Sequence, residues 1–82
     1  MTRENAFENV NEVFRDVFDD ENITVYDVTT AADVAGWDSL EHINLVLAME
    51  DKFKMKFTMG EVTSMKNVGE MVDIIMKRGR CV

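Results

Sequence analysis

Residues 36–53 read GWDSLEHINLVLAMEDKF, and the pattern in this stretch predicts a long apolar helix together with its first residue. Asp38 is a favoured N-cap residue, and Glu41 follows three positions later to complete a capping box. In the apolar run that follows, Asn44 is the one interruption. The helix is therefore predicted to begin at Ser39.

Ser39 occupies the position at which a helix favours negative charge. The first turn of a helix leaves N–H groups without partners, and the helix dipole adds partial positive charge there. A phosphodiester on the serine oxygen would be stabilised at this position. Asp38 and Ser39 also cap helices in many proteins, so the capped start alone does not distinguish a modification site from an ordinary cap.

Helical patterns lie on both sides of this stretch. Between residues 4 and 18 apolar residues recur at intervals of three and four, with acidic residues on the other side, which predicts an amphipathic helix. Thr58 with Glu61, and Asn67 with Glu70, form two further capping boxes. They predict a short helical turn and a final helix.

Two segments outside these helices are rich in strand-forming residues. Residues 19–37 lack helical spacing and are predicted to form a long loop, but residues 23–28 within it contain isoleucine, valine and tyrosine. Residues 52–57 alternate lysine with apolar residues at a period of two. Propensity alone predicts two short strands, although two isolated strands are marginal without a third.

The composition is that of one small acidic domain. The 82 residues allow one modest core, so residues 1–82 are predicted to form a single domain. Sixteen acidic and nine basic residues give a net charge of −7, which disfavours nucleic acid and anionic membranes as partners and favours cationic protein surfaces. Thirteen of the acidic residues but only two basic ones precede Lys52. The acidic surface is therefore expected to come from the first part of the chain.

No stretch is apolar and long enough to span a bilayer, and no apolar signal segment begins the sequence. A cytoplasmic protein without membrane insertion is therefore expected. The single cysteine, Cys81, cannot form an internal disulfide, and it is interpreted as an incidental thiol near the end of the chain.

An oxygen-rich cluster begins at Asp19 and raises the question of a calcium loop. Counted from there, the sixth position is Thr24, where an EF-hand needs glycine, and the twelfth is Thr30, where it needs glutamate. An EF-hand is therefore excluded, and no metal site is predicted.

Two other kinds of function are open on the residues alone. Ser39, His42 and Asp38 supply the groups of a serine hydrolase, but neighbouring residues at one helix start cannot easily place a base, an acid and an oxyanion hole, and there is no glycine-flanked nucleophile elbow. A surface His42 that contacts partners is the preferred interpretation. The seven methionines would also suit a non-covalent lipid- or peptide-binding helical module.

The motif GWDSL at 36–40, with the helix that follows it, resembles the acyl carrier protein family, whose Asp-Ser-Leu motif carries 4′-phosphopantetheine on its serine. The resemblance continues from the helix at 7–18, through 53–57, to the closing segment 67–75, and so covers nearly the whole chain. It implies an all-α fold, a small bundle of three long helices and one short helix, in which the strand-like segments are ordered loops.

Carried over to this sequence, the family motif implies that Ser39 is the attachment site, with Asp38 and Leu40 beside it. A phosphopantetheinyl transferase (holo-acyl-carrier-protein synthase) would add the arm, and the arm's terminal thiol would hold the intermediate as a thioester. The resemblance thus implies a stand-alone, monomeric carrier and not an enzyme. Its clients would be acyl-transferring and condensing enzymes, or an adenylating ligase for an aminoacyl cargo.

The resemblance also implies a recognition surface and an acyl pocket. Asp38, Glu41, Leu47 and Asp51, with Glu50 beside them, fall where family members contact basic patches of their enzymes. The residues expected to line the acyl pocket between the helices are Ile43, Val46, Leu47, Val62, Val68, Val72 and Ile75.

Departures from the fatty-acid type bear on the expected pathway. Asn44 stands where that type usually has an acid, and Lys52, Lys54 and Lys56 follow the helix where such carriers are usually neutral or acidic. These departures favour a specialised pathway, such as lipid modification, surface-polysaccharide or secondary-metabolite synthesis, over housekeeping fatty-acid synthesis; fatty-acid, polyketide and specialised lipid biosynthesis are the pathways in which such a carrier is expected. A peptidyl or aminoacyl carrier is the alternative, and the sequence does not decide whether Trp37 is buried.

Overall fold

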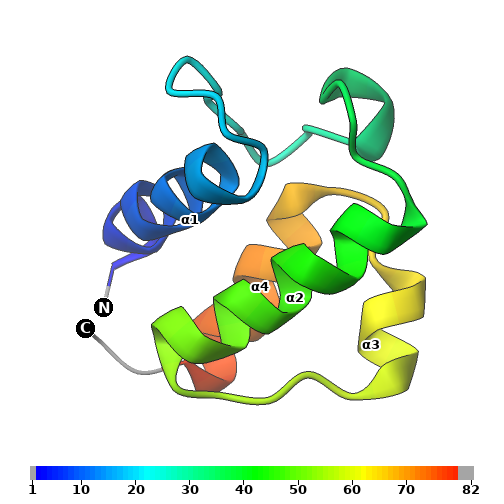
Figure 1. The fold of residues 1–82 in the computed structure, drawn as a ribbon. Helices are drawn as coiled ribbons and strands as arrows, with labels where there is room; N and C mark the ends of the chain where they lie inside the picture. The colour runs from blue at the N-terminus through cyan, green and yellow to red at the C-terminus, as the bar shows by residue number, and fades with distance from the viewer. Residues whose placement is uncertain (1, 80–82) are drawn as a thin grey trace.

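The computed structural model describes residues 2–79, and within them four α-helices and one short 3₁₀-helix follow one another along the chain (Figure 1). The elements are α1 (Arg3–Val17), η1 (Ala31–Asp33), α2 (Ser39–Phe53), α3 (Met59–Ser64) and α4 (Val68–Arg78). No strand forms in this part of the chain, so the all-α fold of three long helices and one short helix is confirmed, and the strands favoured by propensity are wrong. Cys81, which is interpreted as an incidental thiol, lies outside the described residues.

The predicted N-caps form at the starts of α2, α3 and α4. The carboxylate of Asp38 accepts a hydrogen bond from the Glu41 N–H at 2.8 Å. Thr58 and Asn67 do the same for the N–H groups three residues later, at 3.2 and 2.9 Å. Each of these helices therefore begins at the residue that its capping pattern predicts.

The reciprocal half of the capping box is complete in α3 and replaced in α2 and α4. In α3 the Glu61 carboxylate accepts a bond from the Thr58 N–H at 2.9 Å. In α2 the Glu41 carboxylate instead accepts a bond from the side-chain amide of Asn44, also at 2.9 Å. In α4 the Glu70 carboxylate accepts one from the backbone N–H of the residue before the N-cap. The full boxes predicted for α2 and α4 are therefore wrong, although their N-caps are right.

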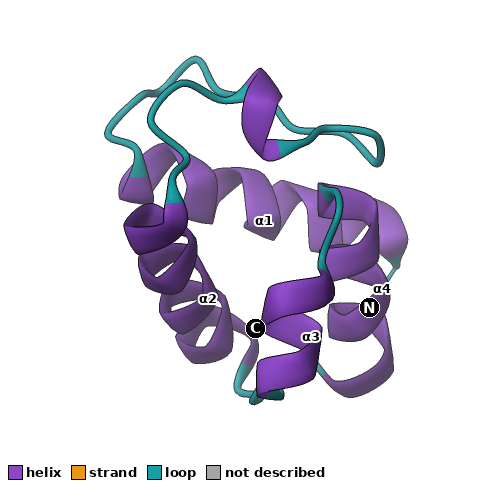
Figure 2. Ribbon diagram, turned by 90° about the vertical axis from the view of Figure 1, so that its right-hand side faces the viewer, coloured by secondary structure: helices purple, strands orange, loops and turns teal. Residues whose placement is uncertain are grey.

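The core lies where α1 meets α2 and α4, and α3 lies on the far side of α2 and α4 from α1, as Figure 1 and Figure 2 show together. The apolar stripe of α1 faces this core, and the acidic residues of α1 lie on its other side. The largest fully buried side chains are Val10, Phe14, Val25, Leu45, Met49, Phe53, Val68, Met71, Val72 and Ile75.

The loop between α1 and α2 is fastened across the N-terminus of α4. The backbone carbonyls of Asp27 and Thr29 accept hydrogen bonds from the N–H groups of Gly69 and Val68, both at 2.9 Å. Two N–H groups that would otherwise lack partners in the first turn of α4 are satisfied in this way. The loop that leads into α2 therefore has a fixed anchor on another helix.

Arg3 strengthens this anchor from the first turn of α1. Its guanidinium pairs with the carboxylate of Asp27 in the loop and with that of Asp73 in α4, the latter at 2.8 Å. The hydrogen bond to Asp27, followed by that to Asp73, raises the pKa of Arg3 above its ordinary value. These partly exposed pairs contribute modestly to stability, and they join three segments that are far apart in the sequence.

The longest helices, α1 and α2, have 15 residues each. Within residues 2–79, no helix combines the length and the apolar character needed to cross a membrane. The cytoplasmic location and the monomeric state expected from the sequence stay predictions.

Candidate functional site

Ser39 is the first residue of α2, and its side chain is exposed. The chain reaches it through Gly36, whose φ of +86° lies in the left-handed region that glycine adopts without strain. Asp38 caps the helix directly before the serine. The hydroxyl is thus presented on a well-defined helix start, on the surface, and next to the first-turn N–H groups.

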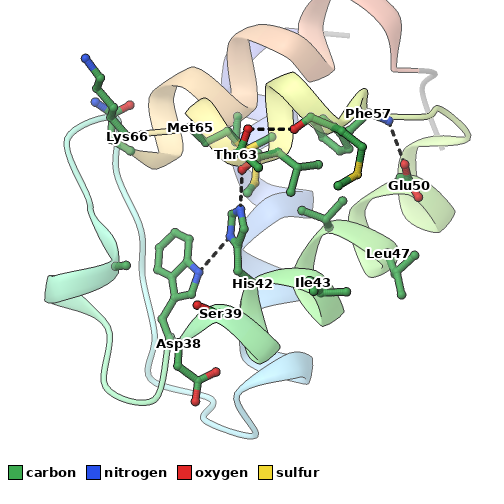
Figure 3. A pocket seen from close by; sticks show the side chains of 17 residues that line it. Asp38, Ser39, His42, Ile43, Leu47, Glu50, Phe57, Thr63, Met65 and Lys66 are labelled. Carbon is green, nitrogen blue, oxygen red and sulfur yellow. Dashed lines mark hydrogen bonds between the residues drawn. The ribbon is translucent and has the colours of Figure 1, made fainter.

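A cavity of about 790 Å³ opens beside Ser39, between α2 and α3 (Figure 3). Its wall is mainly apolar. The lining consists of Ala31, Trp37, Asp38, Ser39, His42, Ile43, Val46, Leu47, Glu50, Phe57, Met59, Val62, Thr63, Met65, Lys66, Asn67 and Met71. A cavity with such a lining suits an apolar chain, since burying methylene groups is favourable.

The predicted pocket residues divide into two groups. Four of them line the cavity: Ile43, Val46, Leu47 and Val62. The other three do not line it and are fully buried in the core: Val68, Val72 and Ile75. Their place in the wall is taken by residues that the sequence analysis did not select: Phe57, Met59, Met65 and Met71.

Exposed apolar side chains surround the serine on the same side of the molecule. Leu40, Ile43 and Leu47 of α2 are 66%, 54% and 57% exposed, and Met59 of α3 is 77% exposed. Figure 3 shows Ser39, Ile43 and Leu47 following one another along α2 beside the cavity. Large apolar side chains exposed together are typical of a surface that contacts another protein.

The acidic residues expected to recognise partners are not equally available. Asp38 and Asp51 are exposed, and Glu41 is half-buried. Glu50 differs from the expectation, because its side chain is only 12% exposed and its carboxylate accepts a hydrogen bond from the Phe57 N–H at 2.8 Å (Figure 3). The structure therefore gives Glu50 a role in holding the loop after α2 and does not present it to a partner.

His42 differs from the surface residue that the sequence analysis preferred. The ring is half-buried and both of its nitrogens are engaged. Nδ1 accepts a hydrogen bond from the indole Nε1–H of Trp37 at 3.1 Å, and Nε2 lies 3.0 Å from the backbone carbonyl oxygen of Val62. Trp37 itself is half-buried, with its ring edge-on to Phe14 at 5.3 Å between centroids. The signal that could have indicated this arrangement is the single histidine five residues after the single tryptophan.

A solution NMR structure of a holo acyl carrier protein from Geobacter metallireducens matches this fold with a TM-score of 0.83. The two sequences are 40% identical, and the match covers 89% of this chain and 84% of that protein. The chain belongs to the acyl carrier protein family. No protein-family model matches it, and no curated protein matches it.

As an acyl carrier protein the chain is a carrier and not an enzyme, and the site agrees with this on geometric grounds. A Ser-His-Asp hydrolase needs a histidine nitrogen that is free to take the serine proton. Both His42 nitrogens are instead held by Trp37 and Val62. Within residues 2–79, no cluster of three or more histidine, cysteine or acidic side chains could hold a metal ion.

Proposed function

We propose that this acyl carrier protein bears 4′-phosphopantetheine on the Ser39 oxygen and holds an acyl intermediate as a thioester on the thiol of that arm. The observation that carries the proposal is the exposed Ser39 hydroxyl at the N-terminus of α2, on the rim of an apolar cavity. The relative from Geobacter is described as a holo protein. A phosphopantetheinyl transferase would supply the arm from coenzyme A.

The helix start supports a phosphodiester at this position. The carboxylate of Asp38 accepts a hydrogen bond from the N–H of Glu41. The dipole of the 15-residue helix places partial positive charge at its N-terminus. A phosphate on an exposed side chain of the first residue lies close to that charge without entering the core. The arm would therefore leave the protein fold intact and reach outward to partner enzymes.

The modification can be tested with a matched control, because the chain has one other serine, Ser64, which is also exposed. The full chain is incubated with coenzyme A, magnesium and a promiscuous phosphopantetheinyl transferase, and its intact mass is measured. Wild type and Ser64→Ala should each gain one phosphopantetheinyl mass, and Ser39→Ala should gain none. Modification of Ser39→Ala, or no modification of wild type with several transferases, would contradict the proposal.

The cavity favours an apolar acyl cargo over an aminoacyl cargo. Each methylene group moved from water into an apolar cavity is favourable by about 0.8 kcal/mol, before the cost of rearranging the wall is subtracted. Methionines supply part of that wall, and their side chains adapt to the shape of a guest: Met59, Met65 and Met71. We infer that the cavity stores the acyl chain between encounters with client enzymes.

Thermal melting of the holo, short-acyl and medium-acyl forms tests this storage. The melting temperature should rise with chain length and then level off when the cavity is full. Equal melting temperatures throughout would place the cargo in solvent and favour a peptidyl or aminoacyl carrier loaded by an adenylating ligase.

The carrier works by positioning. A tethered intermediate is present at a high effective concentration at each active site that the arm can reach. The apolar side chains Leu40 and Leu47, with the carboxylates of Asp38, Glu41 and Asp51, form the surface that we propose as the docking site for cationic partner surfaces. Fatty-acid, polyketide and specialised lipid synthesis all use such carriers. A specialised pathway is favoured by the neutral Asn44 and by three lysines: Lys52 in the last turn of α2, and Lys54 and Lys56 after it.

A further inference from the structure

One histidine joins three segments at the edge of the cavity. Trp37, in the connection before α2, donates its indole N–H to Nδ1 of His42 in α2, and Nε2 of the same ring lies 3.0 Å from the carbonyl oxygen of Val62 in α3. Figure 3 shows the His42 ring pointing from α2 toward α3, with a dashed line on each nitrogen. We call this arrangement the Trp37–His42–Val62 bridge.

The chemistry of its two outer partners determines the protonation state of the bridge. An indole N–H can only donate a hydrogen bond, and a backbone carbonyl can only accept one. Nδ1 must therefore be unprotonated and Nε2 must carry the proton. One neutral tautomer of His42, with hydrogen on Nε2, satisfies both contacts.

A second proton on His42 affects the two contacts differently. The new hydrogen would be on Nδ1, where it meets the indole N–H of Trp37, so that two donors face each other and their hydrogen bond is lost. The bond from Nε2–H to Val62 persists. Histidine is the type of side chain whose charge changes most readily near neutral pH, so acidification is the perturbation that tests this change.

Trp37 is placed where such a change alters the cavity. Its ring lines the cavity together with Ser39 and His42. The same ring packs edge-on against Phe14 of α1, with centroids 5.3 Å apart, and it lies 6.4 Å from the ring of Phe18. The hydrogen bond to His42 is the polar contact that fixes the tryptophan ring relative to α2 and α3.

We propose that His42 is a positioning residue whose protonation state controls the cavity wall beside Ser39. Neutral His42 holds Trp37 in place and the wall is closed on that side. Protonated His42 releases the indole N–H, and the wall between the connection 36–38 and α3 loosens. Acidification then shifts a carried acyl group from the cavity toward the solvent. This consequence rests on the acyl storage proposed above.

Several charged groups face the same cavity and act on His42 through space. Asp38 precedes α2, Glu50 lies in α2 about two turns after His42, and Lys66 precedes α4. Glu61 of α3 adjoins Val62 and pairs with Arg78. Carboxylates and lysines keep their charge between about pH 5.5 and 7.5, so a change in Trp37 within that window reports on His42. A control variant that keeps every other titratable group of the chain separates the contribution of His42 from theirs.

The test uses NMR on the unmodified full chain, which contains one tryptophan and one histidine. At about pH 8, correlations from the ring nitrogens to the ring protons should identify the tautomer with hydrogen on Nε2. On acidification the indole proton of Trp37 should move upfield, following the same pH profile as the His42 ring protons. A tautomer with hydrogen on Nδ1, or an indole signal that ignores the His42 titration, would overturn the proposal.

Two variants separate a proton-controlled bridge from a merely structural contact. In His42→Gln an amide can accept from Trp37 and donate to Val62 but does not titrate, so the indole signal should be present and constant over the same pH range. In Trp37→Phe the ring that packs on Phe14 is kept and the donor is lost, so acidification should no longer move the Phe14 signals that it moves in wild type. A pH response that persists in either variant would contradict the assignment.

A last comparison distinguishes failure of this inference from failure of the proposed function. The stabilisation of the medium-acyl form over the holo form should shrink on acidification in wild type and stay constant in His42→Gln. If it stays constant in wild type as well, His42 does not control the wall and this inference fails. If no stabilisation exists at any pH, acyl storage fails, while the NMR result on the unmodified chain still decides whether His42 holds Trp37.

Discussion

Gly69, the second residue of α4, is a position at which a single added methyl group should disturb the structure. A Cβ placed there would lie 2.7 Å from the Asp27 carbonyl oxygen and 2.9 Å from its carboxylate. Because one of these contacts is with backbone, the loop between α1 and α2 must move to relieve it. Gly60, in α3, offers a matched control, since its nearest neighbour would be the Thr58 hydroxyl oxygen at 4.0 Å.

The size of the effect follows from the contacts that the loop makes. Moving it breaks the hydrogen bonds from Gly69 to Asp27 and from Val68 to Thr29, worth about 1 kcal/mol each. Crowding in a packed region adds about 1 to 3 kcal/mol, and the better helix propensity of alanine returns about 1 kcal/mol. Gly69→Ala should therefore lose about 2 to 4 kcal/mol of stability. Gly60→Ala gains the propensity without the crowding and should be neutral or slightly more stable.

Thermal unfolding followed by circular dichroism measures both variants. For a domain of this size about 1 kcal/mol corresponds to about 4 to 8 °C. Gly69→Ala should melt on the order of 10 °C below wild type, and Gly60→Ala should melt at or slightly above it. Equal melting temperatures for the two variants would refute the reasoning, because they would mean that the loop is not held against α4 at Gly69.

Three further results are expected. Glu50→Gln should lower stability by about 1 to 2 kcal/mol in urea unfolding, because a charged acceptor for a backbone N–H is lost; an unchanged midpoint would contradict its assigned role. The hydrogen bond from Arg78, followed by that from the Thr58 N–H, lowers the pKa of Glu61. The stability that Glu61 contributes is therefore present at neutral pH and is lost as the pH falls through that lowered pKa. Glu61→Gln should melt at a different temperature from wild type at neutral pH and at the same temperature in acid, and a difference that persists in acid would argue against the ion pair. Glu41→Lys should slow modification by the transferase and Lys54→Glu should not, whereas equal effects would mean that the acidic residues form only a solvated surface.

Local sequence patterns were sufficient for the helices and their starts. Asp38, Thr58 and Asn67 each cap the helix that begins at the next residue, because an N-cap acts on N–H groups only two or three positions away. The strand-like alternation at 52–57 was misleading on its own. Residues 52 and 53 belong to the last turn of α2, and the loop that follows tucks its apolar residues inward, with Met55 buried and Phe57 half-buried.

The features that the sequence did not predict depend on contacts between distant segments. The place of Glu50 is set by the Phe57 N–H in the loop beyond α2, and that of His42 by Trp37 and by Val62, which is 20 residues further along the chain. The apolar stripe of a helix can also face either the core or the cavity. Periodicity groups Val72 with the other apolar residues of α4, but it does not say whether that face meets the core or the cavity.

The most direct test of the central claim is to locate the arm within the modified chain. After treatment with coenzyme A and a phosphopantetheinyl transferase, tryptic digestion separates the two serines, since Ser39 falls in peptide 16–52 and Ser64 in peptide 57–66. Fragmentation by tandem mass spectrometry should place phosphopantetheine on Ser39 and leave peptide 57–66 unmodified. An arm on any other residue would contradict the claim that the N-terminus of α2 is the attachment site.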